Sequence, residues 1–534
     1  MDVDLELPTD VLHGLILYAE THYTFRYFGS LLKRREPEVL ADAPWRIEPN
    51  VPIPVLCLIK DANLFPVHLA AISVRVLYPS GRLDEHAFSF RTSMAEPLWH
   101  TILHFVPHEQ GVVFVDVAFR IRTKRKERVI HNDNYRTASH APLRIRVSSE
   151  PLPRDAGWYY GEPHFHTTYS NDQVEFGAPL GAAVSLAKAM GLHWLAATDH
   201  SYDLDDLQDN PLESDPALGL WHQMRAEVLE ANRTHRDFVA LAGEEISCGN
   251  DKGRNIHLLA LGTDRFVEGA GDSAERWLRT RPEWTAAEAI EKVNLGGGIA
   301  YAAHPAERTP FFQWLLIRRG RWSASDLAHP VLRGVQIWNG ERTHGLRNGR
   351  SQWVRLLLDG HRKHILGGND AHGNFNRFRQ IGIPFVAMRE SDRQLFGRVR
   401  TGVFVGGDLT DQAVLDALRN GRSIVTDGPF LGIGFRDEAD CATAIGRTSR
   451  GPAFDLRIQG RTSDEFGAWE ELVLYHGNLG RREETTPVRL GGADLKRTFV
   501  REVSVAGTGP GYIRAEARTT KGHLCMTNPV WIAQ

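Results

Sequence analysis

The chain has 534 residues, of which 42% are apolar and 24% are charged, a composition typical of a soluble globular protein. Lys and Arg total 63 and Asp and Glu total 66, so the net charge of −3 provides no strong basic field, and we expect no nucleic-acid partner. No apolar run approaches the roughly 18 residues that cross a bilayer, and the acidic start lacks the regions of a signal peptide. We therefore expect a cytoplasmic protein without membrane contact, and the oligomeric state stays open.

The cysteines exclude two kinds of small stabilised domain. Cys57, Cys248, Cys441 and Cys525 lie far apart in the sequence, which excludes a disulfide framework and a zinc ribbon. The chain contains 24 histidines, so a metal site would have to be built from imidazoles and carboxylates. Such ligands are more typical of catalytic than of structural metal ions.

Residues 1–153 are predicted to form a β-rich domain. Apolar and polar residues alternate over residues 113–121 and again over residues 143–147, which is typical of half-buried strands. The basic run at residues 120–128 is interpreted as the solvated end of a hairpin. A nucleic-acid contact is the less favoured alternative for this run.

Residues 154–430 are predicted to alternate between helices and short apolar strands. A helix over residues 179–191 precedes a strand over residues 194–197. The capping box Thr285-Ala-Ala-Glu288 opens a helix that ends near Gly296, before a buried strand over residues 299–303. Strands are also expected over residues 238–242, 365–368 and 423–426, and helices through Trp353 and Val414. This alternation predicts an α/β layer or barrel.

Residues 431–534 are predicted to return to β structure. Alternating strands are expected over residues 454–458, 472–475 and 512–516, with Gly-rich turns between them. A small β-sandwich-like domain is the architecture that this pattern favours.

The central segment concentrates His, Asp and Glu at the ends of its predicted strands. In His164-Phe-His166 the two imidazoles would point to one face of a strand. Strand ends converge on one face of a barrel, so segments far apart in sequence would meet there. The candidate ligands are His164, His166, Asp172, His200, Glu245, His257, His304, Asp370 and His372. Nine groups exceed the need of one ion and predict two or three divalent ions (Zn, Mn or Fe), bridged by a carboxylate and a hydroxide.

Three neighbouring residues have simpler interpretations than metal binding. Asp199 is expected to form local hydrogen bonds, and Cys248 to be a small buried thiol. Glu244 is expected to point outward, since neighbours on a strand point to opposite faces. A single histidine after a strand is commonly only a polar loop residue, so the metal hypothesis depends on the whole set.

These residues make the sequence resemble the PHP (polymerase and histidinol phosphatase) superfamily over about residues 155–375. The first motif of the superfamily, Asp-Leu-His-x-His-Thr, corresponds here to Glu162-Pro-His164-Phe-His166-Thr167. The later motifs correspond to Ser170-Asn-Asp172, Thr198-Asp-His200, Gly243-Glu-Glu245, His257, Ala303-His304-Pro305 and Asn369-Asp-Ala-His372. The resemblance implies an α/β fold, a distorted (β/α)7 PHP-type barrel flanked by N-terminal and C-terminal β-sandwich-like domains.

The resemblance also implies how the ligands are shared between ions. One ion would be held by His164, His166, Glu245 and Asp370. Glu245 would bridge to a second ion, held by His257 and His304, and Asp172, His200 and His372 would hold a third. Glu162 replaces an aspartate that is not itself expected to be a ligand. Asp172 stands where some relatives have histidine, so metal identity and occupancy of the third site stay open.

Two further stretches narrow the resemblance. Residues 421–429 and 527–532 are similar to the CehA/McbA-type (carbaryl-hydrolase-like) metallohydrolase branch, which includes hydrolases of carbamate or carboxylic esters. Most PHP enzymes cleave phosphoesters. We therefore expect a metal-dependent hydrolase of a small-molecule ester, with a phosphoester favoured and a carboxylic or carbamate ester as the alternative. A non-catalytic binding module is the second alternative, disfavoured because competent residues fill all nine positions.

The two substrate classes require different residues around the metal ions. A phosphoester would need a proton donor for the leaving oxygen, for which His200 and His372 are candidates. It would also need a cation for its oxygens, for which Arg254 is favoured over Lys252, Arg308, Arg377 and Arg379. A carboxylic or carbamate ester would instead need an apolar pocket, with Phe311, Phe312, Trp314, Trp338 and Phe375 as candidate lining residues.

Overall fold

The computed structural model describes residues 36–533 except for several short segments. The segments outside the description are 124–125, 136–137, 171–176, 209, 270, 272–280, 310–313, 316, 343, 384–386, 437–442, 452 and 507–508. The predicted ligand Asp172 therefore lies outside the described residues, as do Phe311, Phe312 and Cys441. Within the described part of the chain, no helix combines the length and apolar character needed to cross a membrane.

The N-terminal strands form two sheets that share one hydrophobic core. Their bounds are β1 Glu38–Asp42, β2 Arg46–Ile47, β3 Ile53–Lys60, β4 Val67–Leu77, β5 Leu83–Met94, β6 Leu98–Phe105, β7 Gly111–Arg122, β8 Glu127–His131 and β9 Leu143–Val147. The smaller sheet has the order β1-β3-β6, and the larger has the order β2-β9-β7-β4-β5 with β8 beside β7. Apolar residues of both sheets, such as Val55 and Val115, lie in one buried cluster. The alternation in β7 and β9 agrees with the pattern in the sequence.

The central segment contains helices and strands close to the predicted ranges. Its helices are α2 Leu180–Ala189, α3 Ser201–Leu204, α4 Gly219–Thr234, α5 Ala286–Leu295, α7 Ala324–Leu327, α8 His344–Leu358 and α9 Asp411–Arg419. Its strands are β10 Trp158–His166, β11 Trp194–Ala197, β12 Asp206–Leu207, β13 Asn210–Ser214, β14 Val239–Gly249, β15 Asn255–Leu261, β16 Ile299–Ala302, β17 Gly334–Asn339, β18 His364–Gly368, β19 Ala371–His372, β20 Phe378–Ile383, β21 Ala387–Ser391, β22 Arg400–Phe404 and β23 Ser423–Thr426. The predicted capping box of Thr285 and Glu288 is confirmed.

The predicted α/β class with a distorted (β/α)7 PHP-type barrel is wrong. The described chain has far more strand than helix, and most central strands belong to a mixed sheet of 16 strands. Thirteen of these strands have the order β18-β17-β16-β15-β14-β11-β10-β22-β23-β31-β30-β27-β28, and β19, β25 and β32 pair beside them. β14 folds back onto β15 as an antiparallel pair, β15 and β16 are antiparallel, and β22 is antiparallel to both β10 and β23. Apolar runs in a sequence do not distinguish parallel from antiparallel strands, so hairpins were interpreted as parts of helix–strand repeats.

The C-terminal strands continue the central sheet. Their bounds are β24 Phe430–Phe435, β25 Thr448–Arg450, β26 Ala453–Arg461, β27 Trp469–Asn478, β28 Glu483–Gly491, β29 Thr498–Ala506, β30 Gly511–Thr519, β31 Leu524–Thr527 and β32 Val530–Ala533, with a 3₁₀ turn η1 Gly492–Asp494. β23 pairs with β31, which joins the central sheet to the last strands, and β24-β26-β29 form a separate sheet. Both sheets contribute to one buried cluster.

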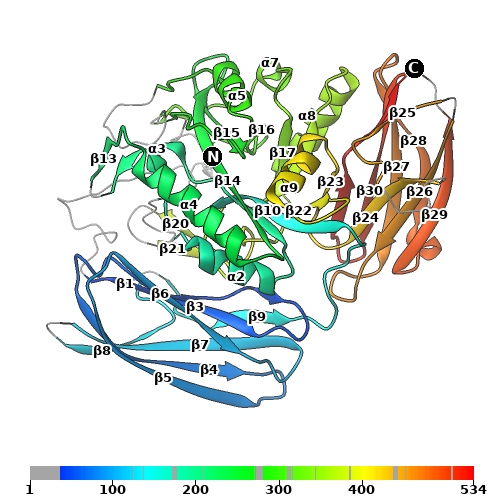
Figure 1. Cartoon of the computed structure of the whole chain (residues 1–534). Helices are drawn as coiled ribbons and strands as arrows, with labels where there is room; N and C mark the ends of the chain where they lie inside the picture. The colour runs from blue at the N-terminus through cyan, green and yellow to red at the C-terminus, as the bar shows by residue number, and fades with distance from the viewer. Residues whose placement is uncertain are drawn as a thin grey trace, which may run out of the picture.

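The three parts of the chain pack on one another. Figure 1 shows the N-terminal strands in blue and cyan below the green central segment, and the C-terminal strands in orange and red beside it. One hydrophobic cluster contains Leu58 from β3, Leu186 from α2 and Leu474 from β27. The flanking strands are therefore packed against the core of the central segment.

A buried histidine in β18 predicts acid sensitivity of the fold. Burial, with Arg333 and Lys363 nearby, lowers the pKa of His364 to about 3. Below pH 6.5 the unfolded chain takes up a proton at this histidine that the folded chain does not, so stability falls as the pH falls toward 3, by about 1.4 kcal/mol per pH unit. The unfolding free energy of His364→Gln, measured in urea between pH 7 and pH 4, should fall less steeply than that of the wild type. Parallel slopes would contradict the prediction.

Candidate metal centre

Two histidines of strand β10 lie side by side. His164 and His166 point to the same side of the strand, and their Nε2 atoms lie 3.2 Å apart. His164 Nδ1 lies 2.9 Å from Gln336 Oε1, and His166 Nδ1 lies 2.9 Å from Ser170 Oγ. The Ser170 hydroxyl donates to Asp199, so it accepts a hydrogen from His166. Both rings can thus carry their hydrogens on Nδ1 and turn the Nε2 lone pairs toward each other, as ligands of one cation do.

Asp199 supports this pair through hydrogen bonds of its own. It accepts hydrogen bonds from the backbone and hydroxyl groups of Thr167 and Ser170, at distances of 2.7 to 3.0 Å. The side chain is fully buried. The prediction that Asp199 forms local hydrogen bonds is therefore confirmed.

Glu245, on β14, is the centre of the cluster. Its Oε1 atom lies 2.7 Å from His257 Nδ1 and 3.2 Å from His304 Nε2. Its Oε2 atom lies 3.1 Å from His200 Nδ1 and 3.4 Å from His166 Nε2. The two oxygens of one buried carboxylate thus face different histidines, which is the arrangement that a bridging ligand requires.

Asp370 and His304 close the cluster from two loops. Asp370 Oδ1 lies 3.1 Å from His164 Nε2 and 3.2 Å from His166 Nε2, and Asp370 Oδ2 accepts a hydrogen bond from Asn339. Both residues have left-handed backbone conformations, with φ of 53° for Asp370 and 26° for His304. Their side chains are the most exposed of the described ligands, at 10% and 13%. We therefore expect metal ions and small molecules to reach the centre from the side of Asp370 and His304.

Glu162 holds β10 and the Asp370 loop together. Its carboxylate accepts hydrogen bonds from the backbone of His164, from the backbone and amide of Asn369, and from the backbone of Gly397. Burial raises the pKa of Glu162 to about 7, although the bonds from Asn369 and Gly397 act in the opposite direction. Its oxygens are used by these donors, in agreement with the expectation that position 162 does not bind metal.

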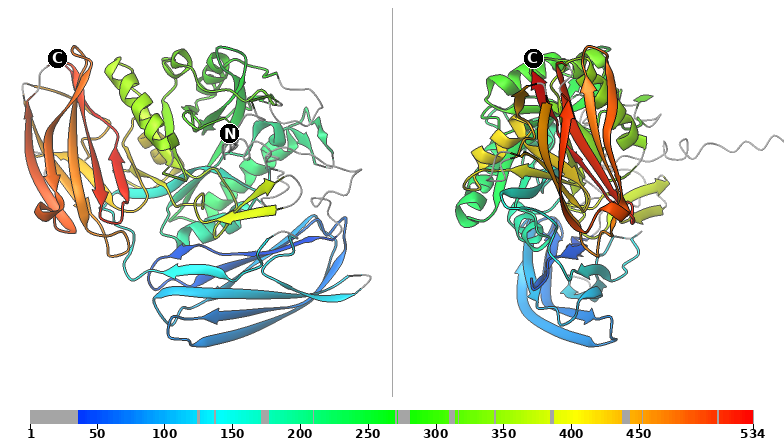
Figure 2. Two further views of the ribbon diagram at one scale, coloured as in Figure 1. Left: turned by 180° about the vertical axis from the view of Figure 1, so that it is seen from behind. Right: turned by 90° about the vertical axis from the view of Figure 1, so that its right-hand side faces the viewer.

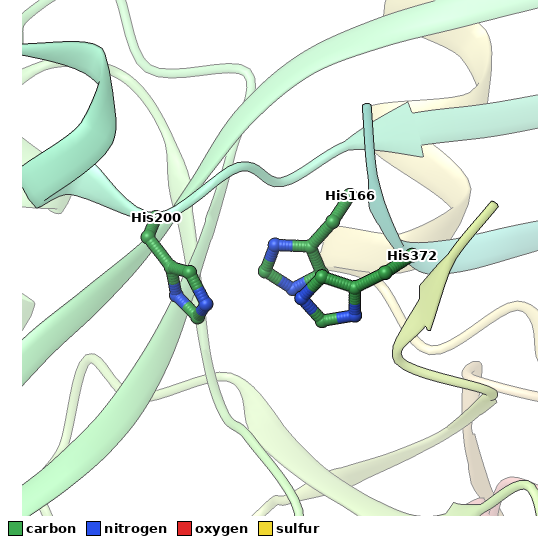
Figure 3. Close-up of side chains that lie close together, drawn as sticks. All are labelled: His166, His200 and His372. Carbon is green, nitrogen blue, oxygen red and sulfur yellow. The ribbon is translucent and has the colours of Figure 1, made fainter. Parts of the chain in front are cut away.

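His200 and His372 converge with His166 beside this group. Figure 3 shows the rings of His166, His200 and His372 facing a common space, with His166 and His372 stacked. The stacked rings have centroids 3.9 Å apart, and the rings of His166 and His200 have centroids 4.4 Å apart. Strand pairing explains this convergence, because β10 pairs in parallel with β19 and places His166 opposite His372.

The donor atoms fit metal ions in number and spacing. Each of three sets has donor atoms within 4.8 Å of one another: His164, His166, Glu245 and Asp370; His200, Glu245 and His257; and His166, His200 and His372. In the first set the contacts are 3.1 to 3.4 Å long. A tetrahedral ion with bonds of 2.0–2.1 Å would separate its ligands by about 3.3 Å.

Electrostatics supports the same assignment. Burial acts to raise the pKa of Glu245, but His257 and His164 outweigh it and hold this pKa well below its usual range. Asp370 behaves alike, with burial opposed by His164 and His166. Within the described residues, Glu245 Oε2, Asp370 Oδ1 and the ring nitrogens of His200 have no hydrogen bond of good geometry. Two ionised carboxylates in a buried cluster need compensating positive charge, which protons or metal ions supply.

The structure brings together eight of the nine predicted ligands, and the ninth, Asp172, lies outside the described residues. The first predicted set is reproduced as a group of four. The second differs, because His200 rather than His304 joins Glu245 and His257, while His304 lies between Glu245 and Asp370. His200 is thus shared between two sets.

Arg254, the cation that the sequence favours for binding a phosphoester, contacts an aromatic residue in this structure. Arg254 stacks on Trp314, 4.2 Å from the ring centroid, and donates to the Trp314 carbonyl. Arg377 and Arg379 contact the N-terminal domain, at Pro142 and Asp133.

Arg319 is buried and lies in the segment between β16 and α7. It is in direct contact with His257 Nε2. Because arginine only donates hydrogen bonds, His257 in this contact carries its hydrogen on Nδ1, which lies 2.7 Å from Glu245 Oε1. Binding of an ion through His257 Nδ1 therefore requires Arg319 to move. No pattern in the sequence distinguished Arg319 from Arg318 and Arg321, whereas Gln336, a polar residue within an apolar strand, gave a signal that was overlooked.

The expected orientation of Glu244 was partly wrong. Glu244 does point away from Glu245, but it is fully buried, not exposed. Its oxygens accept hydrogen bonds from Trp221 Nε1 at 3.0 Å and from the backbone of Val267 at 3.2 Å. Burial raises its pKa to about 8 against these bonds. The reason for the error is α4, which covers this face of β14 and so replaces solvent.

Comparisons with known proteins add little. Neither a protein-family model nor a curated protein matches the chain. A CARDB domain from Pyrococcus furiosus in complex with di-metal ions is 12% identical, with a TM-score of 0.14, covering 23% of this chain and 98% of that chain. A putative beta-galactosidase from Bacteroides fragilis is 10% identical, with a TM-score of 0.20, covering 93% of this chain and 73% of that chain. Similarity this weak supports no statement about fold or function.

Two adjacent glutamates allow a matched test of the centre. Glu245→Gln should lower the metal content of reconstituted protein by at least one ion per chain, because an amide is a poorer bridge than a carboxylate. Glu244→Gln should keep the metal content but lose about 1–3 kcal/mol of stability, because the amide leaves one acceptor oxygen for the two donors Trp221 and Val267. Elemental analysis and urea unfolding measure the two effects. Equal metal content in both variants would contradict the bridging role.

Proposed function

We propose that the protein is a metal-dependent hydrolase that acts on a phosphoester at the cluster around Glu245. The observation that carries this proposal is the position of Glu245, whose two oxygens face separate histidine sets in a group of eight potential ligands. The sequence adds that these residues occur in motifs that resemble those of the PHP superfamily, in the same order along the chain.

The chemistry would be divided between the ions and the chain. Paired divalent ions, when bound, lower the pKa of a water molecule toward neutrality and offset charge on the ester oxygens. The chain supplies the fixed ligand geometry. Gln336 and Ser170 orient His164 and His166, and Glu162 fixes the Asp370 loop to β10. Such supporting hydrogen bonds commonly change metal affinity or activity 10- to 100-fold when removed.

An anionic substrate is favoured by the cations near the centre. Arg319 is next to the ligand His257, where its planar guanidinium can donate two hydrogen bonds to oxygens of a phosphoester. Arg254, on the hairpin between β14 and β15, stays a candidate for the same role. His200 and His372 are proposed as ligands of the third set or as proton donors to the leaving oxygen.

A carboxylic or carbamate ester is the second candidate, and the aromatic residues offer it little support. Trp338 and Phe375 are fully buried and belong to hydrophobic clusters. Trp314 is 43% exposed but stacks with Arg254. A binding module without catalysis would not need a carboxylate placed between two histidine sets.

Chelation and reconstitution test the proposed activity. Exhaustive chelation should abolish turnover, and Mn²⁺ or Zn²⁺ should restore it. Restored activity is expected toward p-nitrophenyl phosphate or bis-p-nitrophenyl phosphate, and not toward naphthyl methylcarbamate or p-nitrophenyl acetate. Chelator-sensitive turnover only of the carbon esters would replace the phosphoester proposal by the second candidate. Absence of metal-dependent turnover in both arms would contradict the hydrolase proposal.

A rim histidine provides a variant that should fold normally. His304→Ala removes a ring that contacts both Glu245 and Asp370 but is partly exposed, so little core packing is lost. We expect hydrolysis to fall by at least 100-fold, with less metal bound and an unchanged circular dichroism spectrum. Full activity in this variant would show that His304 is not part of the active centre.

A further inference from the structure

The loop that carries Asp370 and His372 has a backbone that needs outside support. Asp370, Gly373 and Asn374 have φ values of 53°, 85° and 47°. A left-handed conformation is easily adopted by glycine but costs a residue with a side chain about 1 kcal/mol. Two such residues, Asp370 and Asn374, lie within five positions, and Asp370 is itself a proposed metal ligand. The loop therefore depends on contacts that fix it in place.

The N-terminal domain supplies these contacts. Phe375 follows the loop directly, and its backbone N–H donates to Asp42 Oδ2 at 2.9 Å. The Phe375 carbonyl accepts from the backbone N–H of Trp45 at 2.8 Å. The indole of Trp45 donates to the carbonyl of Phe396 at 3.0 Å, and the Phe396 N–H in turn donates to Asn374. Asp42 and Trp45 thus hydrogen-bond to the N–H and the carbonyl of Phe375, at the end of the loop.

Further bonds extend these contacts toward the hairpin β20–β21. The Asn376 side chain makes two hydrogen bonds with the backbone of Arg144, at 3.1 Å and 3.0 Å. Arg379 lies 3.4 Å from Asp133, and both side chains are buried. Figure 2 shows the hairpin, in yellow-green, between the central segment and the blue N-terminal strands. The chain is therefore attached to the N-terminal domain from Phe375 to Arg379.

Asp42 is well suited to this role. It is 5% exposed, and its second oxygen accepts a hydrogen bond from the backbone of Ala43 at 2.8 Å. Both oxygens therefore accept backbone hydrogens at fixed positions. A charged acceptor makes a stronger bond than a neutral one, so the bond to Phe375 is a firm anchor.

We propose that the N-terminal domain is a working part of the metal centre and that Asp42 is a positioning residue for Asp370 and His372. This inference rests on the proposed metal centre, and it assigns to the N-terminal domain a role in metal affinity. The alternative is that the same contacts only hold two domains together. The two alternatives predict different effects of removing a contact. If the contact only holds the domains together, its loss lowers the unfolding temperature but leaves metal affinity unchanged at temperatures where the protein is folded.

The test is a metal titration of full-length Asp42→Asn. The amide keeps one acceptor oxygen for two backbone N–H groups, so one anchor is lost with little change in volume. With Co²⁺ as the probe, followed by its visible absorption, we expect the affinity of at least one equivalent to fall about 10- to 100-fold, as for other supporting contacts of metal ligands. His372→Ala is the positive control and should lose the same equivalent.

The matched control loosens the N-terminal domain at a different edge. Glu465 binds Arg46 of β2 from the C-terminal part of the chain, at 3.0 Å. Glu465→Gln should lower the unfolding temperature and leave Co²⁺ affinity and the spectrum unchanged. If Asp42→Asn fails to fold, Asn376→Ala replaces it, since it removes the bonds to Arg144 without altering a buried charge, and the same equivalent should weaken.

The outcomes separate this inference from the proposed function. The positioning role is overturned if folded Asp42→Asn binds Co²⁺ with wild-type affinity while His372→Ala loses an equivalent. The same holds for Asn376→Ala where it replaces Asp42→Asn. Equal weakening in Glu465→Gln also overturns the positioning role, because the effect would then be general loosening. A wild-type protein that binds no Co²⁺, Mn²⁺ or Zn²⁺ overturns the metal centre itself. Selective weakening in the loop variants supports the proposal.

Discussion

The buried carboxylate of Glu245 is the constraint on which the rest of the centre depends. An ionised carboxylate without compensation is too unfavourable to keep in an apolar interior. Here two of them, Glu245 and Asp370, lie among imidazoles, and both have pKa values held well below the usual range. The same charges that require compensation also create strong affinity for cations. The architecture around them can be understood as the means of holding these charges at fixed distances.

These charges are held in place by a second layer of polar groups, which lie on strands that are distant in the sequence. Gln336 on β17 orients His164, the pair Ser170 and Asp199 orients His166, and Glu162 joins β10 to Asn369. Each supporting group is buried and has its own hydrogen bonds satisfied, so the ligands have little freedom. A flexible set of imidazoles would lose conformational entropy when it bound an ion. In this set the rings are already ordered by folding, so binding an ion costs little further entropy.

The sequence predicted the ligands better than the architecture that holds them. Spacing alone placed His164 and His166 on one side of a strand, and the structure agrees, because a period of two is a local property. The capping box at Thr285 was predicted for the same reason. The α/β barrel was wrong because strand direction is set by pairing with distant segments, as for β14 with β15. Glu244 was misjudged because its environment is created by α4, and Arg319 because its contact with His257 has no local signature.

The flanking β-strands illustrate how far such non-local effects extend. Their residues contain no pattern of ligands or nucleophiles, so composition and spacing give them no chemical role. Yet Asp42 contacts the loop of Asp370 and His372 across 333 positions of sequence. The ligand types are thus fixed by short motifs, whereas their geometry depends on hydrogen bonds between domains. A variant that retained every ligand could still lose an ion if its N-terminal strands shifted, because the backbone of the Asp370 loop is strained and follows its anchors.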